Sequence, residues 1–204
     1  MTVPDTRTRL VQVAGDLVHR RGYAATGVQE ICEAAGVRKG SFYHFFPSKQ
    51  ALVVATLQPA WLEHRELVLE RAFRPASPST LAQGLQRWGE LLAAIHRDNR
   101  DAPGGHVRGC RFGSLAAECA GREPLVSVAV AGFLTAMADY LAEQVRHAVA
   151  TGECDIDDPG RAGQRLLTQM EGLAVMAKAL NEPELLTRLG RDGSLLLGMR
   201  PTVL

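Results

Sequence analysis

The sequence predicts an all-α protein with a small N-terminal domain and a larger C-terminal one, and three observations carry this prediction. Aromatic residues make up only 5% of the chain, although strands favour aromatic and β-branched side chains. Apolar residues recur at helical spacing along most of the chain. Helix-capping and helix-breaking residues separate these segments. With 204 residues, 46% of them hydrophobic, the chain can bury a substantial core.

The first predicted helix ends at Gly22. Its apolar residues follow the spacing i, i+3, i+4, i+7 and i+8, so they share one stripe: Leu10, Val13, Ala14, Leu17 and Val18. Gly22 follows the last turn, where glycine adopts the left-handed conformation that ends many helices. We therefore expect an amphipathic helix that stops at residue 22.

Residues 26–29 read as a capping box that begins a second helix. The Thr26 hydroxyl is expected to accept hydrogen bonds from first-turn amides, and Gln29 is expected to reach back to Thr26. An apolar stripe follows at Val28, Ile31, Cys32 and Ala35. Gly36 then supplies a tight turn, so this helix should last barely two turns.

A third short helix is predicted over residues 37–46, with Val37, Phe42 and Phe46 at helical spacing. Pro47 breaks it, and Ser48 provides the N-cap of the next helix. Two short helices across a turn that contains glycine are typical of a helix-turn-helix. The N-terminal domain is therefore predicted to be a three-helix helix-turn-helix.

The remaining elements are all predicted to be helices. A long helix runs from Ser48 to about residue 72 with a kink at Pro59, residues 75–79 form a linker, and residues 80–97 form a helix. Residues 98–105 are expected to be an exposed loop. Beyond it we expect a short apolar segment (110–120), a helix (123–150) and a turn (152–158). Asp158 and Pro159 then cap a helix to residue 180, and a last helix covers 182–198.

The positive charge of the chain is concentrated near its N-terminus. The net charge is +1, but residues 1–50 contain seven Lys or Arg against four Asp or Glu. A local basic surplus is typical of nucleic-acid-binding domains. The N-terminus lacks the apolar stretch of a secretory signal, so a cytoplasmic protein without a membrane partner is expected. The four cysteines are too few for a disulfide framework and should be free thiols.

Residues 26–49 carry the chemistry of a DNA-binding site. The helix N-termini at Thr26 and at Ser48 offer amides to phosphates, and Lys49 adds an ammonium group. Gly40 lacks a side chain that would hold the backbone away from a base edge. Donors lie between the two helix starts, at Arg38, Lys39, Ser41, Tyr43 and His44.

The same segment resembles the DNA-binding domain of TetR-family regulators, and the resemblance extends back to about residue 6. It covers roughly a quarter of the chain. It implies that Lys39 and Gly40 approach base edges, and that Ser41 and His44 face the groove. It also implies that Thr26, Tyr43 and Lys49 hold phosphates. Where the family usually reads Tyr-x-His-Phe, this chain reads Tyr43-His44-Phe45-Phe46, so Phe45 replaces a polar contact and either packs or touches a thymine methyl.

Residues 169–178 and the turn after them resemble the penultimate helix of many TetR relatives. In that family the last two helices pair with their symmetry mates in a four-helix bundle, which implies a homodimer suited to an inverted-repeat operator. An ordinary intramolecular core is the alternative. The residues assigned to the interface are Leu166, Met170, Gly172, Leu173, Ala177, Leu180 and Leu195.

Residues 108–118 resemble a segment of a TetR subgroup that includes regulators of the response to electrophiles and oxidants. Cys110 lies between Arg108 and Arg111 at the start of a predicted helix, and both features favour a thiolate. Cys110 is therefore either a sensor or a core residue. His106 and Cys110 have the spacing of two metal ligands, but two ligands do not make a zinc site, so no metal or cofactor is expected.

The larger domain is expected to bind a small-molecule inducer. We place the domain boundary at residue 50, so residues 51–204 form a helical ligand-binding and dimerisation domain. The sequence thus predicts a DNA-binding regulator, with a thiol-dependent enzyme and a helical interaction module as alternatives. Composition assigns to the pocket Trp61, Trp88, Leu92, Cys110, Phe112, Leu115, Phe133, Met137, Met170 and Leu173.

Overall fold

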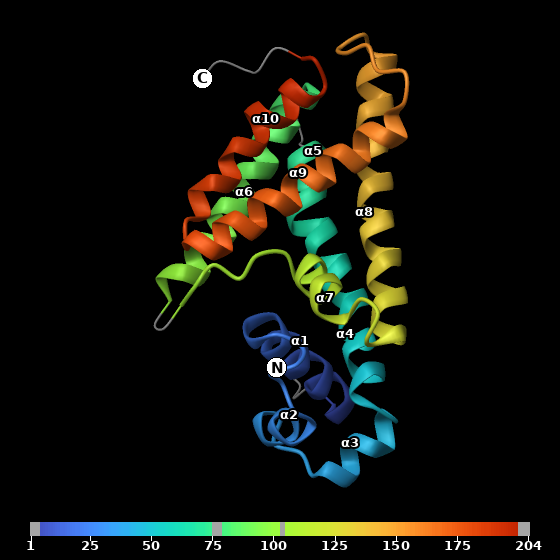
Figure 1. Cartoon of the computed structure of the whole chain (residues 1–204), viewed down its shortest axis with the longest axis vertical. Coiled ribbons are helices and arrows are strands. Elements are labelled where there is room, and N and C mark those ends of the chain that lie inside the picture. Colours follow the sequence, from blue (N-terminus) through green and yellow to red (C-terminus); the bar gives the residue numbers. More distant parts are fainter. Residues whose placement is uncertain (1–4, 75–78, 103–104, 200–204) are drawn as a thin grey trace. The chain divides into compact units, whose positions relative to one another are not determined.

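The computed structural model describes residues 5–74, 79–102 and 105–199, and within these ranges every regular element is helical (Figure 1). The prediction of an all-α protein is confirmed. Contacts divide the chain into two compact units. Unit 1 comprises Met1–Leu62 and Arg111–Phe133, and unit 2 comprises Glu63–Cys110 and Leu134–Leu204. This division differs from the boundary at residue 50, because a segment from the middle of the chain packs with the N-terminal helices.

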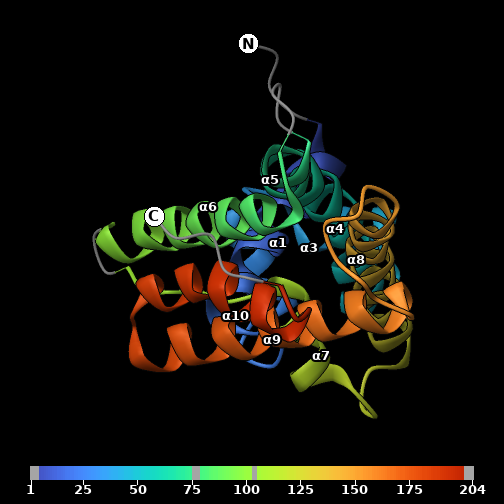
Figure 2. The ribbon, with the colours of Figure 1, turned by 90° about the horizontal axis from the view of Figure 1, so that it is seen from above.

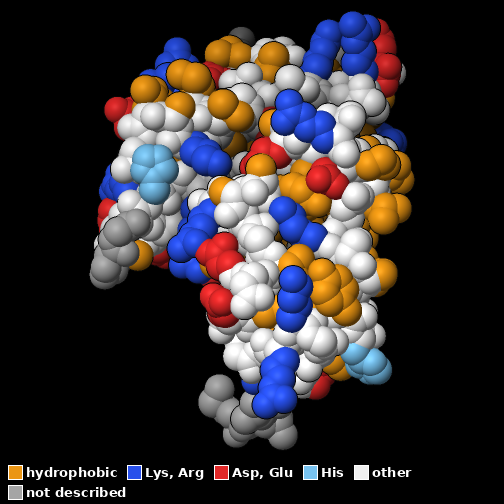
Figure 3. All heavy atoms as spheres, turned by 60° about the horizontal axis from the view of Figure 1, so that its bottom comes forward, with side chains coloured by type: hydrophobic (Ala, Val, Ile, Leu, Met, Phe, Trp, Pro, Cys, Tyr) orange, Lys and Arg blue, Asp and Glu red, His pale blue; other side chains and the backbone are white. Residues whose placement is uncertain are grey.

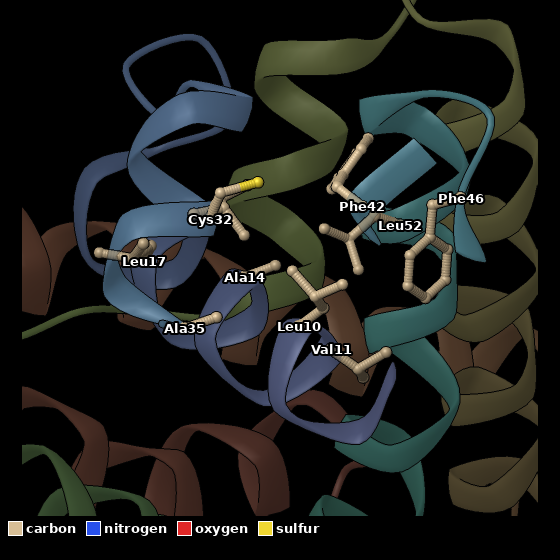
Figure 4. Close-up of a cluster of buried hydrophobic side chains, with 10 residues drawn as sticks. Leu10, Val11, Ala14, Leu17, Cys32, Ala35, Phe42, Phe46 and Leu52 are labelled. Carbon is tan, nitrogen blue, oxygen red and sulfur yellow. The ribbon is translucent and has the colours of Figure 1, made fainter. Parts of the chain in front are cut away.

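Unit 1 begins with three helices, α1 (Thr6–Arg21), α2 (Val28–Ala34) and α3 (Lys39–Phe45). Asp5 caps α1 by accepting a hydrogen bond from the Thr8 amide at 2.9 Å. Gly22 ends α1 with φ +91°, as predicted. Figure 4 shows the apolar side chains of these helices and of α4 pointing toward one another around Leu10, Phe42 and Leu52. This small core fixes the angle between α2 and α3.

The predicted capping box at the start of α2 is wrong. The N-cap residue is Gly27, whose backbone is extended, and no side chain caps the helix. Thr26 is fully buried, and its hydroxyl donates to the Gly22 carbonyl at 2.8 Å. Gln29 donates instead to Glu33 within the helix. Thr26 therefore stabilises the turn between α1 and α2 rather than the helix start.

The long helix predicted from residue 48 is present but changes its winding. Ser48 caps α4 (Lys49–His64) by accepting from the Ala51 amide, and Pro59 lies inside this helix. The chain then forms a π-helical segment, η1 (Arg65–Glu70), and the short α5 (Arg71–Phe73). The wider π turn is the irregularity that sequence periodicity did not reveal.

Two further elements belong to unit 1. They are α7 (Arg111–Cys119) and the first part of α8 (Pro124–Ala150). The Gln50 side chain on α4 accepts a hydrogen bond from the Leu125 amide at 3.2 Å. This contact joins the start of α8 to the start of α4.

Unit 2 is built around α6 (Leu81–Asp101), which lies beside α10 (Arg188–Leu196) and η2 (Pro183–Thr187) in both ribbon views (Figures 1 and 2). Close approach requires glycine here. A Cβ at Gly89 would lie 2.6 Å from the Leu186 carbonyl oxygen. Likewise, α9 (Pro159–Leu180) approaches α8 at Gly163, where a Cβ would lie 2.5 Å from the Ala138 carbonyl oxygen.

The predicted helix limits in this unit are mostly confirmed. Asp158 caps α9 through the Arg161 amide, with Pro159 at the first position. By contrast, α6 continues to Asp101, so the first half of the loop expected at 98–105 is helical. The linker expected at 75–79 lies almost entirely outside the described residues.

Candidate nucleic-acid interface

The surface of α3 exposes the side chains that the sequence assigned to DNA. Phe42 is buried in the core of unit 1, so the opposite side of the helix faces outward. Ser41 is half-buried there. The remaining assigned residues of this segment are exposed: Arg38, Lys39, Gly40, Tyr43 and His44.

The path of the backbone at α3 favours close approach to a large partner. A Cβ at Gly40 would meet nothing within 4 Å, so this glycine is not required by the fold itself. Gly36, with φ +64°, makes the turn that separates α3 from α2. Figure 3 turns the surface that carries α2 and α3 toward the viewer and shows Lys and Arg side chains on it, with hydrophobic side chains between them.

Phe45 is the residue at which this chain departs from the usual pattern. Its side chain is 38% exposed, and its ring meets the His44 ring edge-on with centroids 4.9 Å apart. Phe46, in contrast, is buried in the core. Of the two possibilities raised by the sequence, the geometry thus leaves Phe45 partly available on the outer surface of α3.

Lys49 makes contacts within unit 1 that its charge alone did not predict. Its ammonium group donates to the Tyr23 carbonyl at 2.7 Å and lies 3.9 Å from the centre of the Tyr23 ring. Burial lowers the pKa of Lys49, while the nearby carboxylates of Glu123 and Glu118 act in the opposite direction. The Lys49 ammonium therefore holds the turn after α1 against the start of α4. The side chain of Thr26 is likewise committed to this turn.

The turn after α1 is also held by α7. Glu118 accepts a hydrogen bond from the Ala24 amide at 3.1 Å, and a Cβ at Gly22 would lie 2.6 Å from its carboxylate oxygen. Burial and a hydrogen bond to Glu123 raise the pKa of Tyr23. Sequence reasoning missed Tyr23, Glu118 and Glu123 because the partners lie about a hundred positions apart and carry no local pattern.

The residues assigned to a dimer interface do not all lie on one surface. Leu173 is half-buried. Leu166, Met170 and Ala177 are buried within the protomer, so the structure corrects their assignment: they belong to the core of unit 2. Gly172, Leu180 and Leu195 are exposed, as an interface would require. The sequence missed three further exposed apolar residues of α9 and α10: Val175, Met176 and Leu196.

The residues assigned to the ligand pocket divide between the two units. In unit 1, Phe133 stacks on Phe112 with centroids 5.5 Å apart and lies 6.4 Å from Trp61, and Leu115 is buried nearby on α7. The others belong to unit 2. Four of these are buried: Trp88, Leu92, Met137 and Met170. The other two, Cys110 and Leu173, are half-buried.

The cysteines differ in their surroundings. Cys32 and Cys119 are buried, and burial raises the pKa of each thiol. Cys110 is half-buried directly before α7 and is hydrogen-bonded to the Glu171 carboxyl group. The His106 ring nitrogen lies 3.0 Å from the Lys178 carbonyl oxygen. Among the described residues, no group of three or more His, Cys, Asp or Glu is placed to hold a metal ion.

One helix of the described chain, α8, is long and apolar enough by length and composition to cross a membrane. A third of its most apolar window is buried in the protein, and core helices of soluble proteins meet the same criteria. Asp139 and Glu143 lie on its exposed side. Its hydropathy is therefore weak evidence for a membrane span.

Comparison with known families agrees with this geometry. Residues 10–56 match the family described as "Bacterial regulatory proteins, tetR family", and residues 84–192 match "Tetracyclin repressor-like, C-terminal domain". The chain belongs to the TetR family. It is a DNA-binding transcriptional regulator of a soluble, non-enzymatic family, and the thiol-dependent enzyme considered above is set aside. The resemblance seen in residues 26–49 is thereby confirmed, and α8 is a core helix.

Individual TetR relatives resemble this chain over different lengths. The transcriptional regulator AcuR of Cereibacter sphaeroides is 31% identical over 178 residues, which are 86% of this chain and 77% of AcuR. The repressor NemR of Escherichia coli K12 is 30% identical over 119 residues, 57% of this chain and 55% of NemR. The similarity to AcuR thus extends well beyond the DNA-binding domain.

Solved structures of TetR proteins share the fold along nearly the whole chain. A TetR regulatory protein from Rhodobacter sphaeroides gives a TM-score of 0.80 at 27% identity and covers 94% of this chain and 98% of its own. The reduced form of Escherichia coli NemR gives a TM-score of 0.73 at 22% identity, covering 98% and 100%. The latter similarity concerns the fold alone.

Proposed function

We propose that this TetR-family regulator is a repressor that binds an inverted-repeat operator as a homodimer and is released by a small-molecule inducer. The carrying observation is the outer surface of α3, where Lys39, Gly40, Tyr43 and His44 are exposed while Phe42 anchors the helix in the core. A short helix with donors on its outer side and no side chain at Gly40 suits the major groove.

Within this interface we assign two kinds of contact. Arg38, Lys39 and Gly40, at the start of α3, approach base edges together with Ser41 and His44. The Tyr43 hydroxyl donates a hydrogen bond to a phosphate. Lys49 and Thr26 act indirectly, because their polar groups already hold the turn between α1 and α2. We assign this positioning role to Lys49 and Thr26 in place of a direct phosphate contact.

The proposed dimer surface is the exposed apolar surface of α9 and α10. Its centre consists of Val175 and Met176, which are 63% and 50% exposed in the protomer. Exposed apolar side chains that cluster on two adjacent helices are typical of a protein interface. Gly172 contributes an open position at which a second helix can approach closely. A two-fold dimer of this kind matches an inverted repeat.

The test is binding to DNA from upstream of the gene that encodes this chain. Wild-type protein should protect an inverted repeat in a footprint. Lys39→Ala should weaken binding and relax base preference, because it removes a base contact worth about 1–3 kcal/mol. Arg122→Ala removes the same charge from an exposed site between α7 and α8 and serves as the control. Equal loss in both variants would contradict the assignment of α3.

A second candidate function is release by an electrophile or oxidant through Cys110. The favouring observation is the half-buried position of this thiol directly before α7, while Cys32 and Cys119 are buried. Arg108 and Arg111 favour a thiolate, whereas the Glu171 carboxyl next to the sulfur opposes it. The comparison is operator release of Cys110→Ser and of Cys154→Ser by the same reagent. Only the former should resist, and release of Cys110→Ser at the wild-type rate would exclude this mechanism.

A further inference from the structure

Unit 2 contains buried polar atoms that the described protein leaves without a hydrogen-bond partner. They are the ring nitrogens His64 Nε2 and His96 Nδ1, the indole Trp88 Nε1, the hydroxyl of Tyr140, and Glu171 Oε1. A buried polar group without a partner costs free energy comparable to one or more lost hydrogen bonds. Buried atoms of this kind mark positions at which another molecule can supply the missing partners.

Two of these atoms belong to the same side of one helix. Trp88, Leu92 and His96 are spaced by four residues along α6, and all three side chains are buried. The helical rise places His96 about 6 Å along the axis from Leu92 and about 12 Å from Trp88. The Phe73 ring lies 5.9 Å from the Trp88 ring and 6.2 Å from the Tyr140 ring. This side of α6 therefore passes from a polar end at His96 to an aromatic end at Trp88.

A second buried histidine, His64, comes from α4 and lies close enough to His96 to interact with it. It is the last residue of α4, directly before the π-helical segment η1. Short π-helical segments recur at functional sites because they reposition side chains. His64 and His96 are close enough for the charge of one to disfavour the charge of the other.

The positive charge of Arg108 near His96 favours a negatively charged ligand. Burial, together with His96 for His64 and Arg108 for His96, lowers the pKa of each imidazole to about 4. Both rings are therefore neutral at pH 7, and each carries one N–H donor. Burial also raises the pKa of Glu171, whose Oε1 is another of the buried atoms without a partner. The positive charge of Arg108 acts on His96 and disfavours its protonation.

Other occupants fit these groups less well. A cation would be repelled by Arg108, and the described residues hold no group of three or more metal-ligating side chains. A purely apolar molecule would leave both imidazole nitrogens unsatisfied. An anion that accepts two hydrogen bonds selects the tautomers in which Nε2 of His64 and Nδ1 of His96 carry the proton.

We propose that His64 and His96 bind the carboxylate of a small organic acid whose apolar part lies along Leu92 toward Trp88. This inference rests on the proposed function, since it names the chemical class of the inducer. Two imidazole donors pair with the two carboxylate oxygens, and the apolar side of α6 covers the rest of the molecule.

The experiment measures binding to the full chain without DNA by calorimetry. The probes are the straight-chain monocarboxylates from acetate to hexanoate and benzoate, each with its neutral amide as the matched control. The acids should bind more tightly as the chain lengthens, and the amides at least about tenfold more weakly, because hydrogen bonds to a charged group are the stronger ones. Absence of binding by every acid up to about 10 mM, or equal binding of acids and amides, would overturn the proposal.

Two variants locate the site. His96→Leu should reduce acid binding at least about tenfold, because it removes one of two charge-assisted hydrogen bonds. His147→Leu replaces an exposed histidine of α8 and should bind like the wild type. Acid binding by His96→Leu at wild-type affinity would overturn the assignment.

The unfolding temperature of His96→Leu shows whether a loss of acid binding comes from the missing imidazole or from misfolding. The unliganded His96→Leu protein should unfold at the same temperature as wild type or higher, since leucine removes an unpaired buried nitrogen. Acids that bind but do not release operator DNA would contradict the proposed inducer mechanism and leave the site intact. Operator release by other molecules, with no acid binding, would contradict the site and leave the repressor function intact.

Discussion

At the scale of single residues, the roles of charged and polar side chains depended on contacts that no local pattern reveals. Lys49 was predicted to face a phosphate, yet its ammonium group bonds to the Tyr23 carbonyl and ring. Thr26 was predicted to cap a helix, yet it is buried and caps a turn. In both cases the residue type indicated that the side chain makes a specific polar contact, but only the tertiary structure shows with which partner.

The buried histidines predict how stability depends on pH. The pKa of His64 and of His96 is about 4 in the folded protein, below the ordinary value of 6.5. Between these values the unfolded chain binds more protons than the folded one, so the free energy of unfolding falls as the pH falls from about 6.5 to 4. Urea unfolding should show a loss of roughly 2–4 kcal/mol between pH 7 and pH 5, about 2 kcal/mol for each histidine.

The matched variant identifies the source of that loss. His96→Leu should show a smaller dependence of the free energy of unfolding on pH, while His147→Leu, at an exposed site, should keep the wild-type dependence. If His96→Leu and wild type lost the same stability between pH 7 and pH 5, the burial of His96 would not be the cause.

At the scale of elements, α7 contacts the turn that connects α1 to the DNA-binding helix pair α2 and α3. Glu118 on α7 accepts from the Ala24 amide, and the Gly22 backbone lies directly against its carboxylate. Gly22 has φ +91°, a conformation that strains any other residue. The turn is therefore held by a close approach that requires glycine.

Gly22→Ala should destabilise the protein by roughly 1–3 kcal/mol, through the strained φ and the overlap with Glu118. In the double variant Gly22→Ala, Glu118→Ala, part of that loss should return because the overlap is relieved, and the φ strain should remain. Gly40→Ala, at an open site without positive φ, is the control and should leave the free energy of unfolding nearly unchanged or raise it. Strict additivity of the two single changes would argue against the contact.

Most elements could be predicted from sequence because their caps and breakers are local. Gly22, Ser48, Asp158 and Pro159 mark helix limits that the structure retains. The winding of η1 could not be predicted, since apolar spacing barely differs between an α and a π turn. Periodicity also failed on α9, where apolar residues lie on several sides of the helix. Leu166 and Ala177 are buried within the protomer, whereas Val175 and Met176 are exposed.

At the scale of the whole molecule, the exposed apolar surface of α9 and α10 predicts that the regulator assembles through these helices. Val175→Glu places a charge at a position that is 63% exposed in the protomer, so the protomer should fold normally. In a packed interface the same charge is costly, and the dimer should dissociate to monomers in analytical ultracentrifugation. Ile95→Glu, on an exposed site of α6, should leave the association unchanged. Equal sedimentation of all three proteins would place the interface elsewhere.

The most direct test of the central claim is the dependence of DNA affinity on salt. A dimer that places two α3 helices on an inverted repeat neutralises several phosphates, so the logarithm of the association constant should fall steeply and linearly with the logarithm of the salt concentration. Arg38→Ala, at an exposed site at the start of α3, should make that slope shallower or relax the base preference. An affinity that stays constant across salt, or that is equal for the inverted repeat and for random DNA, would contradict the account.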